Sequence, residues 1–215
     1  MNKKELDHPS LDIVESKGTG LSGKKIVLCV AGSVAAYKSI ELARLLMRHG
    51  AKVTCVMSNA STKMIQPDYM KWATGNDVIT KLTGKLEHIN IADYKKSDLI
   101  IVYPATANTL GKLANGIDDT PISTVLTVGF GSKTPILMAL AMHASMYENA
   151  AVKKNILFFR NEIFFFTAAF SYIDACIAKA IRIGVLDPNP TVSTVEIGVS
   201  SIPFASFPNV LAVAG

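Results

Sequence analysis

The sequence predicts an α/β fold in which helices cover both faces of a parallel β-sheet. Four apolar runs of strand length alternate with segments of helical periodicity from residue 24 to about residue 160. The runs are apolar at nearly every position, which is typical of parallel strands buried on both faces. Because each strand is followed by a helix and then another strand, the connections are expected to be right-handed βαβ crossovers.

The first strand is predicted over residues 24–32, "KKIVLCVAG". Residues 33–50 form the first helix, in which apolar residues recur every three or four positions. Ser33 is its expected N-cap and Gly50 its expected C′ residue. The remaining elements follow in order: strand 52–58, helix 60–74, a strand at 98–102 with its lead-in, helix 107–115, a helix from about 120, strand 134–143, and a helix at 148–159 that leads to a further strand.

The bulk composition fits one globular domain. The chain has 215 residues, of which 49% are apolar and 18% are charged. Its net charge of +5 is spread over isolated lysine pairs without a basic run, which argues against a nucleic-acid binder. The polar N-terminus is unlike a signal peptide, and no uninterrupted apolar stretch is long enough for a membrane span.

Cysteine usage predicts a reducing, cytoplasmic environment. Cys29, Cys55 and Cys176 lie far apart, without the spacing of a metal site. Cys29 and Cys55 fall within strand-like runs, so they are expected to be buried, reduced thiols. Three segments are predicted: an arm at residues 1–22, the main domain at 23–182, and a tail at 183–215 that lacks lysine, arginine and clear periodicity.

Small and polar residues follow three of the predicted strands. They occur in "AGSVAAYK" (31–38), "MSNAST" (57–62) and "PATANT" (104–109). Each segment alone is also typical of a helix cap. Because the carboxyl ends of parallel strands meet at one edge, and N–H groups at helix starts bind phosphate, the three together predict a site for a phosphorylated, largely apolar ligand.

Histidine is the first candidate for a base near neutral pH. His49 ends the first helix, where a cation suits the helix dipole, so it is expected to be structural. His88 precedes the third strand and His143 ends the fourth, so both are candidates for this edge, while His8 lies in the arm. A lone histidine is more often an ordinary surface residue, and sequence spacing alone does not separate the two roles.

Four motifs in order carry a family resemblance. They are "GSVAAYK", "HI" before a strand, "PATANTLGKLANGIDD" and "AMHASMY", within residues 24–156. Together they resemble the homo-oligomeric flavin-containing cysteine decarboxylases, in particular the coenzyme A branch of that family. The resemblance implies a Rossmann-like (flavodoxin-like) single domain at 23–182 with bound FMN. It also implies a homotrimer, or a dodecamer of trimers, and a separate synthetase.

The resemblance implies roles for individual residues. His88 would assist oxidation of the substrate thiol, and Asn108 would orient the substrate carboxylate. Met142 and His143 stand in a substrate-binding motif in which histidine replaces the family's asparagine. Cys176 would serve the final reduction, although the glycines that usually follow this cysteine are missing and a buried thiol is the alternative. The residues implied to border the flavin are Gly32, Ser33, Val34, Ser58, Asn59, Ala60, Thr106, Ala107, Asn108, Thr109 and Ala141.

The implied reaction is decarboxylation of 4′-phosphopantothenoylcysteine to 4′-phosphopantetheine by a carboxy-lyase. The cysteine moiety would be oxidised to a thioaldehyde, lose carbon dioxide as an enethiol, and then be reduced again. Three alternatives remain: a flavin prenyltransferase, which lacks the histidine before the third strand, a peptidyl-cysteine decarboxylase, and a non-catalytic regulatory subunit that binds a protein phosphatase. Regulatory relatives tend to carry long acidic tails, which this chain lacks.

Overall fold

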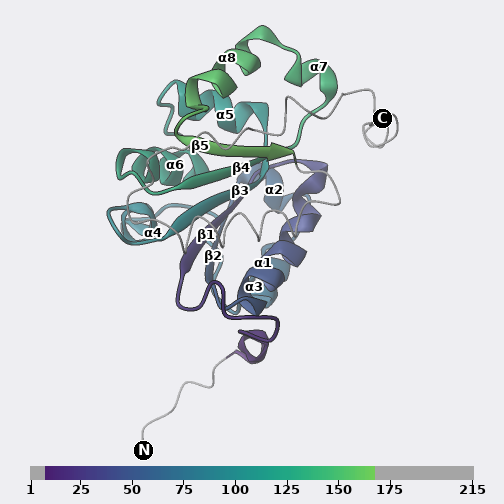
Figure 1. The fold of residues 1–215 in the computed structure, drawn as a ribbon, viewed down its shortest axis with the longest axis vertical. Helices are drawn as coiled ribbons and strands as arrows, with labels where there is room; N and C mark the ends of the chain where they lie inside the picture. The colour runs from purple at the N-terminus through teal and green to yellow at the C-terminus, as the bar shows by residue number, and fades with distance from the viewer. Residues whose placement is uncertain (1–7, 168–215) are drawn as a thin grey trace, which may run out of the picture.

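A five-stranded parallel sheet forms the centre of the molecule (Figure 1). The computed structural model describes residues 8–167, with side chains described as far as Ile163. The strand order is β2-β1-β3-β4-β5, and every neighbouring pair is parallel. The prediction of a parallel α/β sheet is therefore confirmed. The strands are β1 (Lys25–Val30), β2 (Lys52–Met57), β3 (Leu99–Ala105), β4 (Ile136–Leu140) and β5 (Ile163–Thr167).

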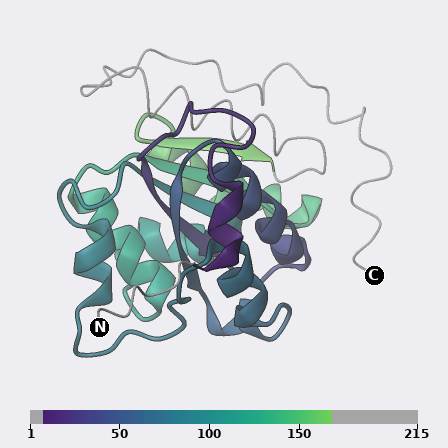
Figure 2. The ribbon, with the colours of Figure 1, turned by 90° about the horizontal axis from the view of Figure 1, so that it is seen from below.

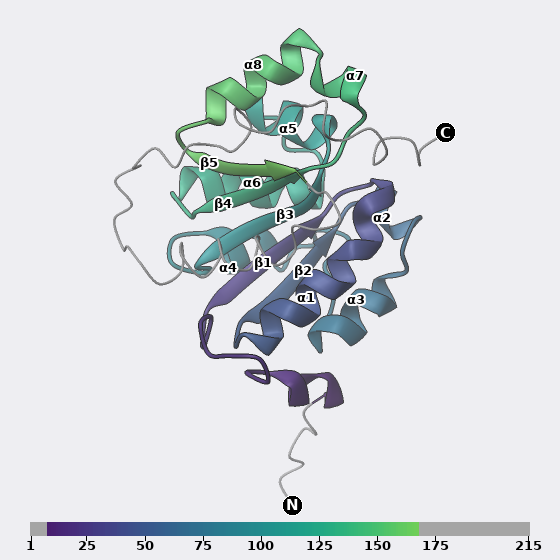
Figure 3. The same ribbon diagram turned by 45° about the vertical axis from the view of Figure 1, so that its right-hand side comes forward.

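Helices lie on both faces of the sheet, as Figure 3 shows. On one face, α1 (Lys38–Arg48) and α3 (Pro67–Thr74) pack side by side. Helices α4 (Glu87–Ala92), α5 (Ala107–Ala114), α6 (Pro121–Gly131) and α8 (Ala150–Phe159) contribute to the core of the other face. The short elements are η1 (Pro9–Ile13), η2 (Val34–Tyr37), α2 (Asn59–Thr62) and α7 (Ala144–Tyr147).

The strands divide their apolar side chains between two cores. Ile26 and Leu28 of β1 pack under α1, whereas Val27 and Cys29 face the helices of the other side. Every residue of β3 is buried, because that strand lies between two others and under helices on both faces. Burying each large side chain contributes about 1.5–3 kcal/mol, which makes both cores together the main source of stability.

Several predicted elements differ from the structure in detail. The strand predicted at 134–143 is the shorter β4, which ends at Leu140, so His143 lies beyond the strand. The first helix begins as the 3₁₀ turn η2, because the Ser33 hydroxyl caps a tight turn ahead of α1. The predicted helix 60–74 is two helices, since Pro67 holds Gln66 in an extended conformation and starts α3. The lead-in to the third strand contains α4, a helix of six residues that is too short to produce a periodic pattern.

The second half of the predicted N-terminal arm is packed rather than loose. Leu21 is 1% exposed, and η1 contacts α1 and α3. Figure 2 shows this purple turn against the blue helices. His8 stabilises its start by accepting the Ser10 N–H at 3.2 Å. The polarity of this segment predicts an arm outside the domain. Its side chains Leu11, Ile13 and Leu21 nevertheless pack against the apolar core on the α1 side of the sheet. The predicted segment boundaries remain predictions, and Cys176 and the tail lie outside the described residues.

Both cysteines of the described region are core residues, as predicted. Cys29 and Cys55 are free thiols with no solvent exposure, and they belong to opposite cores. Burial raises the pKa of Cys29 to about 12 and also raises the pKa of Cys55. Neither thiol is a nucleophile at neutral pH. No helix within residues 8–167 combines the length and apolarity that crossing a bilayer requires.

We expect Gly129→Ala to destabilise the fold and Gly131→Ala to leave it as stable or more so. A Cβ at Gly129 would lie 2.2 Å from Cδ1 of the fully buried Ile100, whereas nothing lies within 4 Å of the corresponding position at Gly131. Overpacking should cost Gly129→Ala about 1–3 kcal/mol. Helix propensity should give Gly131→Ala up to about 1 kcal/mol. Both glycines lie in α6, so urea unfolding of the two variants compares their stabilities within one helix. Equal unfolding midpoints would contradict the packing of α6 on β3.

Candidate functional site

Backbone hydrogen bonds join the carboxyl ends of four strands into one edge. Ser58, after β2, donates its N–H to Val30 of β1 at 3.2 Å. Ala31, after β1, donates to Pro104 of β3 at 3.3 Å. Ala141, after β4, donates to Ala105 of β3 at 2.8 Å. The segments that the sequence predicts to border a ligand therefore lie at the same edge of the sheet.

The loops after β1 and β2 touch at a glycine. A Cβ at Gly32 would lie 2.4 Å from the Cβ of Ala60, so no larger residue fits without displacing the loop. Ser58 accepts the Ser61 N–H at 3.1 Å and thereby caps α2. The N–H groups of Asn59 and Ala60 have no acceptor within residues 8–167 and remain available to an anion.

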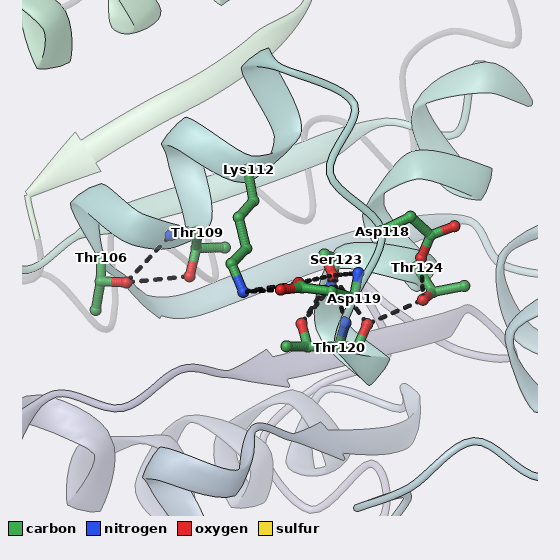
Figure 4. Close-up of polar contacts among 8 residues, drawn as sticks. All are labelled: Thr106, Thr109, Lys112, Asp118, Asp119, Thr120, Ser123 and Thr124. Atoms are coloured by element: carbon green, nitrogen blue, oxygen red, sulfur yellow. Dashed lines mark hydrogen bonds and ion pairs between the residues drawn. The ribbon is translucent and has the colours of Figure 1, made fainter.

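The loop after β3 presents polar groups in a fixed arrangement. Thr106 caps α5 by accepting the Thr109 N–H at 3.3 Å, and the two hydroxyl oxygens lie 3.1 Å apart (Figure 4). Ser39 of α1 donates to the Tyr103 carbonyl at 2.5 Å and ties the opposite layer to this loop. Asn108 is exposed, and its carboxamide makes no hydrogen bond within the described part of the chain. It is therefore free to contact a ligand.

His88 is the second residue of α4, in the crossover between β2 and β3. Met57, the last residue of β2, donates its N–H to Ile79 at 2.9 Å, so the chain reaches the carboxyl edge before it turns into α4. The Nδ1 atom of His88 is buried and has no hydrogen-bond partner among the described residues. Such an orphaned nitrogen is costly in a folded protein, and a bound ligand is one way to satisfy it. His88 makes no hydrogen bond to the loops described above.

His143 and Met142 follow β4 at the same edge. The Nδ1 atom of His143 lies 2.9 Å from the Ser145 hydroxyl and accepts the Ser145 N–H at 3.3 Å. The neutral ring therefore carries its proton on Nε2, which is left as a donor. His49, by contrast, is the C-cap of α1, which agrees with the structural role predicted for it.

Residues 115–119 end the motif that contains Thr106, and they lie in the turn between α5 and α6 (Figure 4). Lys112 Nζ lies 2.7 and 2.9 Å from the two carboxylate oxygens of Asp119, and its hydrogen bond lowers the pKa of that carboxyl. Thr120 and Ser123 form a reciprocal capping box at the start of α6, and Asp118 accepts the Thr124 hydroxyl. Sequence reasoning missed this role, although the Thr-Pro-x-Ser pattern is typical of a helix start.

The four loops of this edge offer backbone N–H donors, hydroxyl groups and a carboxamide, and no described hydrogen bond joins His88 to them. The loop residues at 31–34, 58–60, 104–109 and 141–143 carry no lysine, arginine, aspartate or glutamate. A large, mostly apolar ring system with a phosphate fits such a surface, because the backbone donors take the anion while the small side chains allow close approach. The residues present are thus suited to a flavin mononucleotide.

Comparison with known proteins agrees with this geometry. The model of the family described as Flavoprotein matches residues 14–192. The coenzyme A biosynthesis bifunctional protein CoaBC of Thermococcus kodakarensis is 52% identical over 153 residues, which are 70% of this chain and 38% of that protein. The chain thus spans little more than a third of the length of the curated relatives it matches.

Two solved structures are similar in fold. The FMN-dependent cysteine decarboxylase TvaF from thioviridamide biosynthesis has a TM-score of 0.63 at 25% identity, covering 76% of this chain and 99% of that one. The peptidyl-cysteine decarboxylase EpiD has a TM-score of 0.59 at 27% identity, covering 66% of this chain and 85% of that one. Since the family model covers most of the sequence, the chain belongs to the flavoprotein family.

Proposed function

We propose that this protein binds FMN and decarboxylates 4′-phosphopantothenoylcysteine to 4′-phosphopantetheine, a carboxy-lyase step in coenzyme A biosynthesis. The observation that carries the proposal is the 52% identity to the CoaBC protein over 153 residues, which are 70% of this chain. Identity to the peptidyl-cysteine decarboxylase EpiD is only 27%. This difference favours a small phosphorylated cysteine amide over a peptide as the substrate.

The strand-end loops are proposed to hold the cofactor. Gly32, Ser33 and Val34 would line one side of the flavin, with Ser58, Asn59 and Ala60 beside them, and Thr106 to Thr109 and Ala141 would complete the pocket. The unpaired N–H groups of Asn59, Ala60, Ala107 and Asn108 are the donors available to its phosphate or ring oxygens. When bound, FMN accepts two electrons and two protons from the substrate and later returns them.

The protein's own side chains would position the substrate and move its protons. His88 is proposed to take the thiol proton as the cysteine side chain is oxidised to a thioaldehyde. The Asn108 carboxamide would hold the carboxylate until carbon dioxide leaves, with the bonding electrons passing into the thioaldehyde to give an enethiol. Met142 and the Nε2–H of His143 would contact the amide of the substrate. Reduction of the enethiol restores the two electrons, so the overall reaction exchanges a carboxylate for hydrogen.

Cys176, which lies outside the described residues, is proposed as the proton donor of the final reduction. We also propose a trimer-based assembly, a separate synthetase that supplies the substrate, and a cytoplasmic location. The buried, unpaired thiols of Cys29 and Cys55 support a reducing compartment. Nucleic acid and membranes are not among the proposed partners.

A flavin prenyltransferase is the second candidate, because it would use the same strand-end pocket. The presence of His88, with its unsatisfied buried nitrogen, favours the decarboxylase. A regulatory subunit without catalysis would not require that nitrogen to be left unpaired. Product analysis separates the three, since only the decarboxylase releases carbon dioxide from a cysteinyl amide.

Flavin binding should depend on Gly32. We expect the wild-type protein to be yellow and Gly32→Ala to lose most of its flavin, because the added methyl group would overlap Ala60 at 2.4 Å. Gly84→Ala is the matched control, since nothing lies within 4 Å of the corresponding position. Absorbance of the released flavin, normalised to protein, measures occupancy. Equal occupancy in both variants would place the cofactor elsewhere.

His88→Asn should retain flavin but lose decarboxylation. Removal of a positioned base costs about 10²–10⁴-fold in rate, and asparagine cannot take the thiol proton. Release of carbon dioxide from 4′-phosphopantothenoylcysteine, together with flavin content, gives both readouts. His49→Asn serves as the control, because His49 only caps α1. Full activity of His88→Asn would remove this residue from the mechanism.

Cys176→Ser should stop the reaction after carbon dioxide has left. A serine hydroxyl is a far weaker acid than a thiol, so the enethiol should accumulate in place of the saturated thiol. Mass spectrometry separates the two products by two hydrogens. Formation of 4′-phosphopantetheine at the wild-type rate would instead identify Cys176 as a packing residue.

A further inference from the structure

The helix that carries His88 begins without a side-chain cap. Helix α4 has six residues, Glu87–Ala92, and its N-cap position is taken by Leu86, whose side chain has no hydrogen-bond acceptor. N-cap positions favour serine, threonine, aspartate and asparagine, which satisfy the free N–H groups of the first turn. A helix this short is not stable on its own, so contacts with the rest of the domain must hold it in place.

The carboxylate of Glu87 closes the loop that leads into α4. Its Oε2 atom accepts the Thr83 N–H at 2.9 Å, and its Oε1 atom accepts the hydroxyl of the same threonine. These hydrogen bonds lower the pKa of the Glu87 carboxyl, so it is ionised at neutral pH. The Thr83 hydroxyl oxygen accepts the Lys85 N–H at 3.3 Å, and the Lys85 carbonyl accepts from the Asn90 carboxamide at 3.1 Å. The loop at residues 83–86 is thus tied to the first turn of α4.

Leu86 adopts a backbone conformation that is rare for leucine. Its φ of 55° and ψ of 44° lie in the left-handed region, where the Cβ of an L-residue is crowded. Burial does not compensate, because the residue is 55% exposed. Such a conformation persists only where the surrounding structure imposes it. The hydrogen bonds between Glu87 and Thr83 join the residues on either side of this turn, so they hold Leu86 in the left-handed region. Its carbonyl then accepts the Asn90 N–H at 3.1 Å, which starts α4.

The two ends of α4 are held by different parts of the molecule. At the carboxyl end, Asp93 accepts the Ser132 hydroxyl at 3.0 Å, and Ala92 is buried in the core. Ser132 is the C-cap of α6, which packs against α4. At the amino end, the side-chain hydrogen bonds that the first turn makes within residues 8–163 all go to residues 83–85. The orientation of the first turn therefore depends on this loop.

His88 follows Glu87 directly in this first turn. Its buried Nδ1 atom has no hydrogen-bond partner among the described residues, so packing and the path of the backbone set the direction of the ring. A shift of the first turn would move the imidazole with it. A displacement of about 1 Å from the productive geometry can lower a rate by about 10²-fold.

We propose that Glu87 is a positioning residue for the decarboxylation: its carboxylate holds the loop at residues 83–86 and thereby fixes the imidazole of His88. This role deepens the proposed function and rests on it, because the part that His88 plays in catalysis is itself proposed. Glu87 acts through the backbone of α4 and does not contact the substrate.

Steady-state kinetics of the flavin-loaded protein with 4′-phosphopantothenoylcysteine tests this role. Glu87→Ala should lower kcat by about 10–100-fold because the base is displaced, while KM stays within about twofold and flavin content is unchanged. Glu87→Gln, which keeps one acceptor oxygen for Thr83, should recover part of the lost kcat. Glu41→Ala is the matched control and should react like the wild type, since Glu41 also lies in the first turn of a helix and pairs with Lys38.

Leu86 offers a separate test of the same turn. Leu86→Gly should keep the wild-type kcat, because glycine adopts the left-handed region without strain. Leu86→Ile should lower kcat as Glu87→Ala does, because a β-branched residue resists this conformation. Equal kcat values for the two Leu86 variants would contradict the dependence of His88 on this turn.

Hydrogen exchange, followed by mass spectrometry of the native protein, gives a measurement that does not depend on catalysis. Peptides spanning residues 82–91 should exchange about tenfold faster in Glu87→Ala than in the wild type or Glu41→Ala, because the loop and the first turn of α4 open more often. Unchanged exchange in these peptides would overturn the proposal.

The kinetic outcomes separate this role from the proposed function. If His88→Asn loses activity while Glu87→Ala keeps its kcat, Glu87 is not a positioning residue and the proposed function stands. If Glu87→Ala loses flavin in proportion to kcat, its role is merely structural and the proposal fails. If His88→Asn keeps full activity, the proposed base is wrong, and the role of Glu87 is overturned with it.

Discussion

The three backbone hydrogen bonds between strand ends are the constraint on which the candidate site depends. They run from Ser58 to Val30, from Ala31 to Pro104 and from Ala141 to Ala105, and they join four chain segments at one edge of the sheet. Loops are usually the most variable part of an α/β domain. Here the loops are extensions of the sheet ladder, so the cores that stabilise the strands also fix the spacing of the site. The close approach of Gly32 to Ala60 leaves the loops after β1 and β2 little room to move relative to each other.

The helical layers add a second level of positioning. Ser39 reaches from α1 to the Tyr103 carbonyl, and the pair Lys112 and Asp119 fixes the turn that leads from α5 to α6. Helix α6 in turn packs against α4, which carries His88. The candidate base is thus placed through packed helices, whereas the loop residues are placed through the sheet. A base held in this way can be oriented independently of the surface that contacts the cofactor.

Much of the fold could be predicted because its signals are local. The apolar runs of β1 to β4, the Ser33 cap and the polar strand ends are each visible within a few residues. What could not be predicted depends on tertiary contacts. Helix α4 has no periodicity of its own, and the packing of residues 8–22 depends on surfaces that α1 and α3 supply. The pairing of Lys25 with Lys52 appears only when the register of β1 and β2 is known, since the two residues are 27 positions apart.

The loops at the carboxyl edge of the sheet contain no lysine, arginine, aspartate or glutamate. At the carboxyl edge the loops are uncharged, so an anion would be held by backbone N–H groups, whose geometry is fixed and whose strength is little affected by pH. Donors fixed in this way suit a flavin that must be held in one orientation.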